Sequence, residues 1–166
     1  MTTIYKDIAL EASMEQVWAA IRDVGAVHRR LATGFVVDCH RDGNARVVTF
    51  ANGMVARELI VGIDDQHRRV AYSVVEGQAT HHNASMQIFA NGEGRSRLVW
   101  ITDVLPDEVA GPLAEMIEQG SAVMKQTLER GNLSDSCGLG GDMPGERGHE
   151  CLEAGHLRKA TTITGG

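Results

Sequence analysis

The sequence is poor in cysteine, proline and aromatic residues. Its 166 residues include three cysteines, three prolines and seven aromatic side chains (three Phe, two Trp and two Tyr). The odd cysteine count argues against a disulfide framework. The first residues, Met1-Thr2-Thr3-Ile4-Tyr5-Lys6-Asp7, have no basic segment followed by an apolar run, so no secretory signal is indicated. We therefore expect a cytoplasmic protein without structural disulfides.

Basic charge and long apolar runs are also lacking. The net charge is −6 and the isoelectric point is about 5.6, whereas nucleic-acid-binding domains typically carry a basic patch and an isoelectric point above about 9. No stretch approaches the roughly 18 consecutive apolar residues of a membrane helix. We therefore expect no nucleic-acid partner and no integral membrane association, while the oligomeric state stays open.

Motifs for metal, cofactor and nucleophilic chemistry are lacking as well. Cys137 and Cys151, with His149 and His156 nearby, do not have the compact spacing of a zinc site. His81 and His82 are neighbours in an expected strand, so their side chains point to opposite faces and cannot ligate one ion. The sequence has no Gly-x-Ser-x-Gly motif. We expect no metal site and no cofactor.

Glycine is abundant, and its distribution divides the chain. Nine of the 19 glycines fall after residue 130, whereas every aromatic residue falls within the first 100. The segment after residue 130 has few large apolar side chains, so it cannot bury enough surface to offset the entropy of ordering it. We expect one folded domain over residues 1–130 and a glycine-rich, disordered tail over residues 131–166.

The folded part is predicted to hold seven strands and three helices. Ser13 and Gln16 form a capping-box pattern before a helix that ends near Gly25, and Asn52-Gly53 is a strong hairpin signal. A long helix is predicted from Asp107 to Arg130, with Gly131 as its stop. The expected strands are residues 4–12, 33–40, 45–51, 54–63, 69–75, 81–90 and 97–105, with a short helix at 26–31.

This order predicts an α+β fold. Six consecutive strands joined by short turns make an antiparallel sheet, and the long last helix needs an apolar surface to cover its hydrophobic stripe. The expected architecture is a curved sheet wrapped around that helix, with an interior that the helix alone does not fill. Such an interior is a natural small-molecule cavity.

Several segments resemble the START-like, or Bet v 1-like, superfamily and its bacterial branch of polyketide cyclase/dehydrase and lipid-transport proteins. The resemblance covers about residues 3–130 and is carried by residues 13–23, 46–53, 57–65, 69–72 and 100–106. It implies the helix-grip fold with an interior cavity, whose members bind lipids, hormones or polyketides and are in a minority of cases enzymes. The segments 58–65 and 69–75 also resemble the plant abscisic-acid receptors, which implies that Glu58 points into the cavity.

Strand alternation then assigns the remaining strand residues to the cavity face, and the stripe of the last helix adds three more. The expected ligand-binding residues are Arg46, Val48, Phe50, Met54, Glu58, Tyr72, His82, Met86, Trp100, Met116, Gly120 and Met124. For Met116, Gly120 and Met124, packing in the core is an equally good interpretation. Gly120 is notable because glycine inside a helix costs about 1 kcal/mol relative to alanine.

Glu58 is the strongest candidate for a functional polar residue in the cavity. A carboxylate in an apolar cavity needs a partner or a shifted pKa, and Arg46, Tyr72 and His82 are the nearest candidates by alternation. One hypothesis is a binding or carrier protein for a hydrophobic or amphipathic small molecule that is lipid-, polyketide- or aromatic-like. The alternative is a cyclase- or dehydratase-like enzyme with Glu58 as its general acid/base, and the sequence does not name the ligand.

Overall fold

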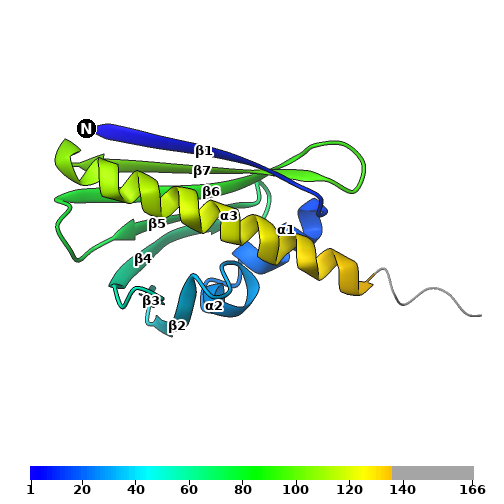
Figure 1. The fold of residues 1–166 in the computed structure, drawn as a ribbon, viewed down its shortest axis with the longest axis horizontal. Coiled ribbons are helices and arrows are strands. Elements are labelled where there is room, and N and C mark those ends of the chain that lie inside the picture. Colours follow the sequence, from blue (N-terminus) through cyan, green and yellow to red (C-terminus); the bar gives the residue numbers. More distant parts are fainter. Residues whose placement is uncertain (136–166) are drawn as a thin grey trace, which may run out of the picture.

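The computed structural model describes the backbone of residues 1–135 and the side chains of residues 1–130. The fold is α+β: one seven-stranded antiparallel sheet, two short N-terminal helices and a long C-terminal helix (Figure 1). The strands are β1 (Thr2–Leu10), β2 (Val36–Asp42), β3 (Ala45–Phe50), β4 (Val55–Asp64), β5 (Arg69–Val74), β6 (His81–Ala90) and β7 (Ser96–Leu105). The helices are α1 (Met14–Ile21), α2 (Val27–Arg30), the 3-10 turn η1 (Asp107–Val109) and α3 (Ala110–Asp135).

The sheet has the order β1-β7-β6-β5-β4-β3-β2, so the first strand pairs with the last. The strands from β2 to β7 follow one another as a meander, because each short turn returns the chain beside the strand it has just left. The sheet curves around α3, which runs along its concave face (Figure 1). The predicted fold class is therefore confirmed.

The hairpin between β3 and β4 turns at Asn52-Gly53, as the sequence predicts. Gly53 has a φ of +85°, which a side chain would strain. The Asn52 side chain accepts a hydrogen bond from the Met54 backbone N–H at 3.0 Å. This tight turn places Met54 at the end of the hairpin, facing α3.

Helices α1 and α2 close one end of the interior. Ser13 caps α1 with a complete capping box. Its hydroxyl accepts a hydrogen bond from the Gln16 backbone N–H, and the Gln16 side chain accepts one from the Ser13 backbone N–H. The apolar face of α1 buries Val17 and Ile21 in the core, and Trp18 donates its indole N–H to Asp65 at 3.0 Å. These two helices therefore fill the space at that end with packed side chains.

Helix α3 buries an apolar stripe against the sheet, with Ile117, Met124 and Leu128 all in the core. Its outer flank is held to β1, because Lys125 donates to the Ala9 carbonyl at 2.7 Å and Lys6 pairs with Glu118. The helix continues through residue 131 to Asp135, so the prediction that Gly131 stops it was wrong. A glycine in a helix weakens it by about 1 kcal/mol but does not end it when the backbone hydrogen bonds continue.

Other element ends differ from the predictions by a few residues. β1 spans residues 2–10 rather than 4–12, because it pairs with β7 from Thr2 opposite Val104 to Leu10 opposite Ser96. β2 starts at Val36 rather than at residue 33, because the Val36 N–H bonds to the Ala32 carbonyl in the turn that follows α2. The predicted tail from residue 136 onward, with its two cysteines, lies outside the described residues. No helix within the described residues is long and apolar enough to cross a membrane.

Candidate ligand-binding cavity

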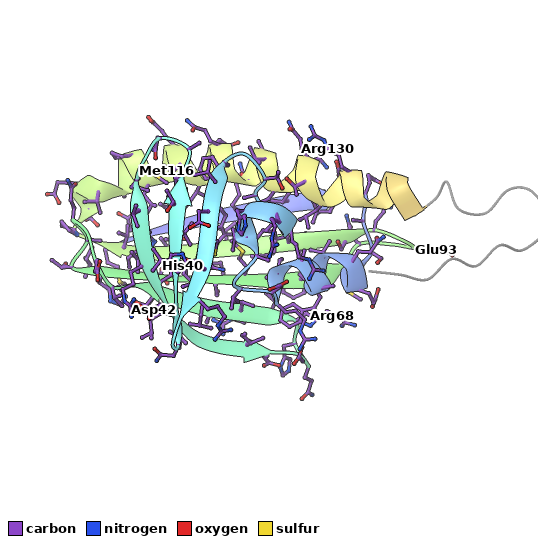
Figure 2. The ribbon with its side chains drawn as sticks, turned by 90° about the horizontal axis from the view of Figure 1, so that it is seen from below. His40, Asp42, Arg68, Glu93, Met116 and Arg130 are labelled. Atoms are coloured by element: carbon purple, nitrogen blue, oxygen red, sulfur yellow. The ribbon has the colours of Figure 1, made fainter. Side chains whose placement is uncertain are left out.

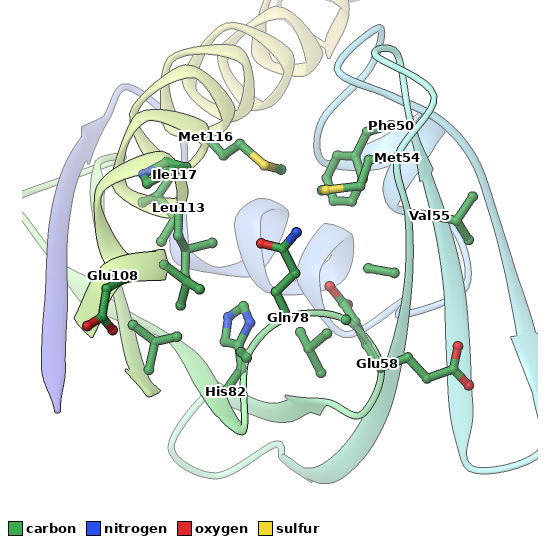
Figure 3. A pocket seen from close by; sticks show the side chains of 18 of the residues that line it. Phe50, Met54, Val55, Glu58, Gln78, His82, Glu108, Leu113, Met116 and Ile117 are labelled. Atoms are coloured by element: carbon green, nitrogen blue, oxygen red, sulfur yellow. The ribbon is translucent and has the colours of Figure 1, made fainter. Parts of the chain in front are cut away.

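A cavity of about 600 Å³ lies between the concave face of the sheet and the first half of α3 (Figure 3). It is at the end of the sheet opposite α1. Its mouth is formed by the β3–β4 hairpin, the β5–β6 loop and η1 with the start of α3. In Figure 2, Met116 lies on the part of α3 that borders the cavity, and Glu93 lies at the opposite end of the molecule.

The walls of the cavity are mainly apolar. Leu113, Met116 and Ile117 of α3 face Phe50 and Met54 of the hairpin across the open space (Figure 3). The remaining apolar wall residues are Phe35, Val55, Ala56, Val74, Ala79, Trp100, Val104, Val109 and Pro112. A volume of this size and character is typical of small-molecule sites.

A small set of polar side chains also lines the cavity. Glu58 and His82 come from β4 and β6, and Gln78 projects inward from the β5–β6 loop (Figure 3). Glu76 and Glu108 are exposed at the mouth. Ligand sites commonly combine an apolar wall with a few polar groups that orient the ligand.

Glu58 has a strong partner. It lies directly opposite Arg46 in the β3–β4 pairing, and the Arg46 Nε donates to Glu58 Oε2 at 2.5 Å. Both side chains are buried, with 6% and 8% of their surface exposed. The sequence argument that a buried Glu58 needs a partner is satisfied by this ion pair.

Arg46 is further fixed on two sides. Its guanidinium donates to the Val24 carbonyl at 3.4 Å and lies 4.9 Å from the centre of the Tyr72 ring, within cation–π range. Burial works to lower the pKa of Arg46, but the charges of Glu58 and Tyr72 and the hydrogen bond to Glu58 raise it above its ordinary value. Arg46 is therefore a permanently charged group, and two of its nitrogens donate to partners in the protein.

Tyr72 and Trp100 complete this polar cluster. Burial, with the nearby charge of Glu58, raises the pKa of the Tyr72 hydroxyl far above its ordinary value, so it stays protonated. The Trp100 indole N–H approaches that hydroxyl closely enough to oppose the shift, but it does not reach hydrogen-bond geometry and has no partner among the described residues. Trp100 thus lines the cavity with its ring, while its N–H is buried and directed toward Tyr72.

Among the described residues that line the cavity, His82 is the one histidine. Burial lowers the pKa of His82 below its ordinary value; the charge of Glu58 opposes this shift and His81 adds to it. His82 is therefore neutral at physiological pH and offers one donor and one acceptor nitrogen. Its neighbour His81 is exposed on the other face, as the alternation predicts.

A second, much smaller cavity of about 50 Å³ lies deeper, toward α2. Phe35, Phe50, Glu58 and Trp100 line both cavities, and the two phenylalanine rings meet edge to face at 5.5 Å between centroids. A Cβ added at Gly120 would lie 3.1 Å from the Phe35 ring. The glycine in α3 therefore gives room to this ring.

The structure distributes the twelve expected ligand-binding residues over three places. Phe50, Met54, Glu58, His82, Trp100 and Met116 line the main cavity. Arg46, Val48, Met86 and Met124 line the deep cavity, together with Phe50, Glu58 and Trp100. Tyr72 lies in the core beside Arg46, and Gly120 lies against Phe35; neither lines a cavity.

Sequence reasoning missed most residues of the mouth. Gln78, Glu76 and Glu108 sit in loops or at a helix start, where no periodicity marks the inward side. Leu113 and Ile117 could have been found, because they share the apolar stripe of the last helix with Met116 at spacings of three and one. Phe35 falls inside the expected strand 33–40, but it lies just before β2, so alternation along the strand does not fix its direction.

Metal-ligating and nucleophilic groups do not gather in this part of the chain. Among the side chains that the structure describes, no three of the types His, Cys, Asp and Glu lie close enough to hold a metal ion. Cys39 is buried and donates weakly to the Val24 carbonyl at 3.5 Å. Burial raises the pKa of the Cys39 thiol, so the reactive thiolate form is disfavoured.

Comparison with known sequences gives one family match. Residues 1–131 match the family described as polyketide cyclase/dehydrase and lipid transport. The match begins at the first strand and covers nearly all the described residues. No curated protein is significantly similar to the chain in sequence.

Solved structures share the fold at low identity. The protein XoxI from Bacillus cereus is similar with a TM-score of 0.70 at 19% identity, over 82% of this chain and 99% of that one. Norcoclaurine synthase from Thalictrum flavum, a point mutant bound to a transition-state analogue, has a TM-score of 0.63 at 19% identity, over 81% and 96%. A START superfamily protein from Mycobacterium smegmatis has a TM-score of 0.63 at 15% identity, over 77% and 97%.

Proposed function

The chain belongs to the polyketide cyclase/dehydrase and lipid transport family, and from this premise we propose that it binds a hydrophobic or amphipathic small molecule in the cavity beneath α3. The observation that carries this proposal is the cavity itself, about 600 Å³ of space with predominantly apolar walls. An empty apolar space of this size is a large loss of packing in a domain of this length. A ligand that fills it recovers both the apolar burial and the van der Waals contacts.

The experiment is a binding titration with 1-aminoanthracene, an uncharged aromatic fluorophore. Met116→Trp places a large ring in the cavity, whereas Val61→Trp adds the same ring on the exposed outer side of β4, where Val61 is 65% exposed. We expect saturable binding by the wild-type protein and by Val61→Trp. Met116→Trp is expected to weaken binding by about tenfold or more, equal to about 1.4 kcal/mol.

Two results would reject the proposal. One is the absence of saturable binding to the wild-type protein. The other is equal affinity in Met116→Trp and Val61→Trp, because the probe would then bind elsewhere on the surface. Thermal unfolding of both variants controls for a change in the fold.

A second candidate function is catalysis of a cyclase or dehydratase type, with Glu58 as general acid/base. It is favoured by one observation: two titratable groups, Glu58 and the neutral His82, line the same cavity. In such a reaction Glu58 removes a proton from a carbon between two carbonyl groups. That carbon then attacks another carbonyl carbon, and the proton passes to the resulting alkoxide to give a hydroxyl. Removal of a second proton from the same carbon by Glu58 forms the double bond, and that proton is delivered to the hydroxyl as it leaves as water.

The discriminating test uses a linear poly-β-ketone thioester as the probe substrate. If Glu58 is the acid/base, Glu58→Gln retains binding and loses the cyclised product. Full activity in Glu58→Gln would remove Glu58 from the mechanism. A wild-type protein that binds the thioester without accelerating its cyclisation is a carrier toward this substrate class.

A further inference from the structure

The charges around the cavity point to the polar end of the ligand. We infer that the cavity takes a neutral or cationic amphiphile, such as a long-chain alcohol or amine, and rejects the corresponding carboxylate. This inference rests on the proposed binding function and specifies the chemical class of its ligand.

The formal charges that line the main cavity are all negative. Glu58 lies on its wall, and Glu76 and Glu108 lie at its mouth. None of the described residues that line the cavity is a lysine or an arginine. An incoming carboxylate therefore approaches past two like charges, Glu76 and Glu108, and meets inside only Glu58, whose charge is compensated by Arg46. An ammonium group meets favourable potential at the same mouth.

The nearest buried cation is not available to an anionic ligand. Arg46 lines the deep cavity behind Phe35 and Phe50 rather than the main one. Its Nε already donates to Glu58 at 2.5 Å, and its Nη1 donates to the Val24 carbonyl. A carboxylate in the main cavity would thus be buried without a counter-ion, which is strongly unfavourable.

Another cation lies near the mouth but belongs to the outer surface. Arg57 interacts electrostatically with Glu76 and forms an ion pair with Asp42. It alternates along β4 with the inward Glu58, so its side chain points away from the cavity. Arg57 therefore moderates the charge of Glu76 without providing an anion site inside.

The polar groups inside the cavity suit a ligand that donates hydrogen bonds. The Glu58 carboxylate is an acceptor only, and the Gln78 amide and His82 ring each offer an acceptor as well as donors. Gln78 is exposed on the β5–β6 loop, and its side chain points from the mouth toward the cavity (Figure 3). The Gln78 amide and the His82 ring can also donate to a hydroxyl oxygen, so a hydroxyl group can be satisfied on both sides and an ammonium group on the acceptors.

The test compares three probes with the same ten-carbon chain: decanol, decylamine and decanoate. Each competes at pH 7, below its micelle concentration, with bound 1-aminoanthracene. We expect decanol and decylamine to displace the fluorophore at concentrations about tenfold or more below that required for decanoate, a difference of about 1.4 kcal/mol. Displacement by decanoate at equal or lower concentration would overturn the inference.

A charge-reversal variant sharpens the test. Gln78→Lys places a cation at the mouth of the cavity, and Gln66→Lys makes the same change in the β4–β5 turn, away from the cavity. We expect Gln78→Lys to strengthen decanoate binding about tenfold while Gln66→Lys leaves it unchanged. Equal effects of the two variants would mean that the net charge of the protein, and not a cation at the cavity, determines the affinity for decanoate.

The two proposals fail in different ways. If 1-aminoanthracene does not bind at all, the binding function is wrong and the competition cannot be run. If 1-aminoanthracene binds and decanoate competes as well as decylamine, the binding function stands and only the ligand class is wrong.

Discussion

The two ends of the interior differ in how they are filled. At the α1 end, Leu10, Val17 and Leu98 come from three different elements and have no more than 1% of their surface exposed. At the other end, Leu113 and Met116 face an open cavity, and Met54 is 40% exposed. One helix is too narrow to fill a curved seven-stranded sheet, and the two short helices plug only one end. The cavity is the space that they leave.

The Arg46–Glu58 ion pair lies at the boundary between these ends, and removing half of it has the largest expected effect. Either Arg46→Met or Glu58→Leu leaves one buried charge unpaired and lowers the free energy of unfolding by about 3–5 kcal/mol. The double variant removes both charges and is expected to be close to wild type. Urea unfolding measures all four proteins.

The ion-pair interpretation has a clear contrary result. If the double variant is as unstable as the sum of the two single variants, the charges do not act as a pair. Each side chain would then stabilise the protein through its own separate contacts.

Leucine truncation compares the two ends directly. Leu98→Ala empties a fully packed site and is expected to cost about 2–5 kcal/mol. Leu113→Ala enlarges an existing cavity and is expected to cost roughly 1 kcal/mol, because Leu113 has fewer neighbours to lose. Equal costs by urea unfolding would contradict the contrast between a filled end and an open end.

The contrast between the two ends also explains how much the sequence predicts. The antiparallel sheet and the long helix follow from alternation and spacing, because those elements are regular. The cavity-facing strand residues follow from the same alternation once the family resemblance directs Glu58 inward. Among the residues chosen in this way, Met54, His82 and Met116 line the main cavity. Arg46 on β3 and Met124 on α3 lie deeper, since strand alternation and helical spacing give the face of an element but not the depth along it.

The mouth of the cavity was beyond such reasoning. Gln78 and Glu108 lie outside regular strands, where the direction of a side chain depends on the tertiary path of the loop. Gly120 shows a different limit: the sequence marked this glycine as costly inside a helix but did not identify the Phe35 ring that packs against it.

Two glycines of α3 provide a smaller test of the same comparison. A Cβ at Gly111 meets nothing within 4 Å, whereas at Gly120 it meets the Phe35 ring at 3.1 Å. Gly111→Ala is expected to stabilise the protein by about 0.5–1 kcal/mol through helix propensity. Gly120→Ala is expected to gain less, because the Phe35 ring must shift. Thermal unfolding compares the two variants. An equal gain in stability in both would show that the Phe35 ring moves aside without an energetic cost.

The smallest expected effect is a pH dependence from His82. Because burial lowers its pKa in the folded state, the unfolded chain binds more protons below about pH 6.5, the ordinary pKa of histidine. The free energy of unfolding therefore has its full value above that pH and declines as the pH falls below it. His82→Gln should flatten this decline, whereas exposed His81→Gln should not. Identical pH profiles for both variants and the wild type would remove His82 as the source.

The most direct test of the central claim is a methyl NMR titration of the methionines with 1-aminoanthracene. Met54 and Met116 line the main cavity, whereas Met14 lies on α1 at the packed end. A ligand held beneath α3 shifts the methyl signals of Met54 and Met116 with one saturation curve and leaves that of Met14 in place. Shifts confined to Met14, or no saturable shift at Met54 and Met116, would contradict the account.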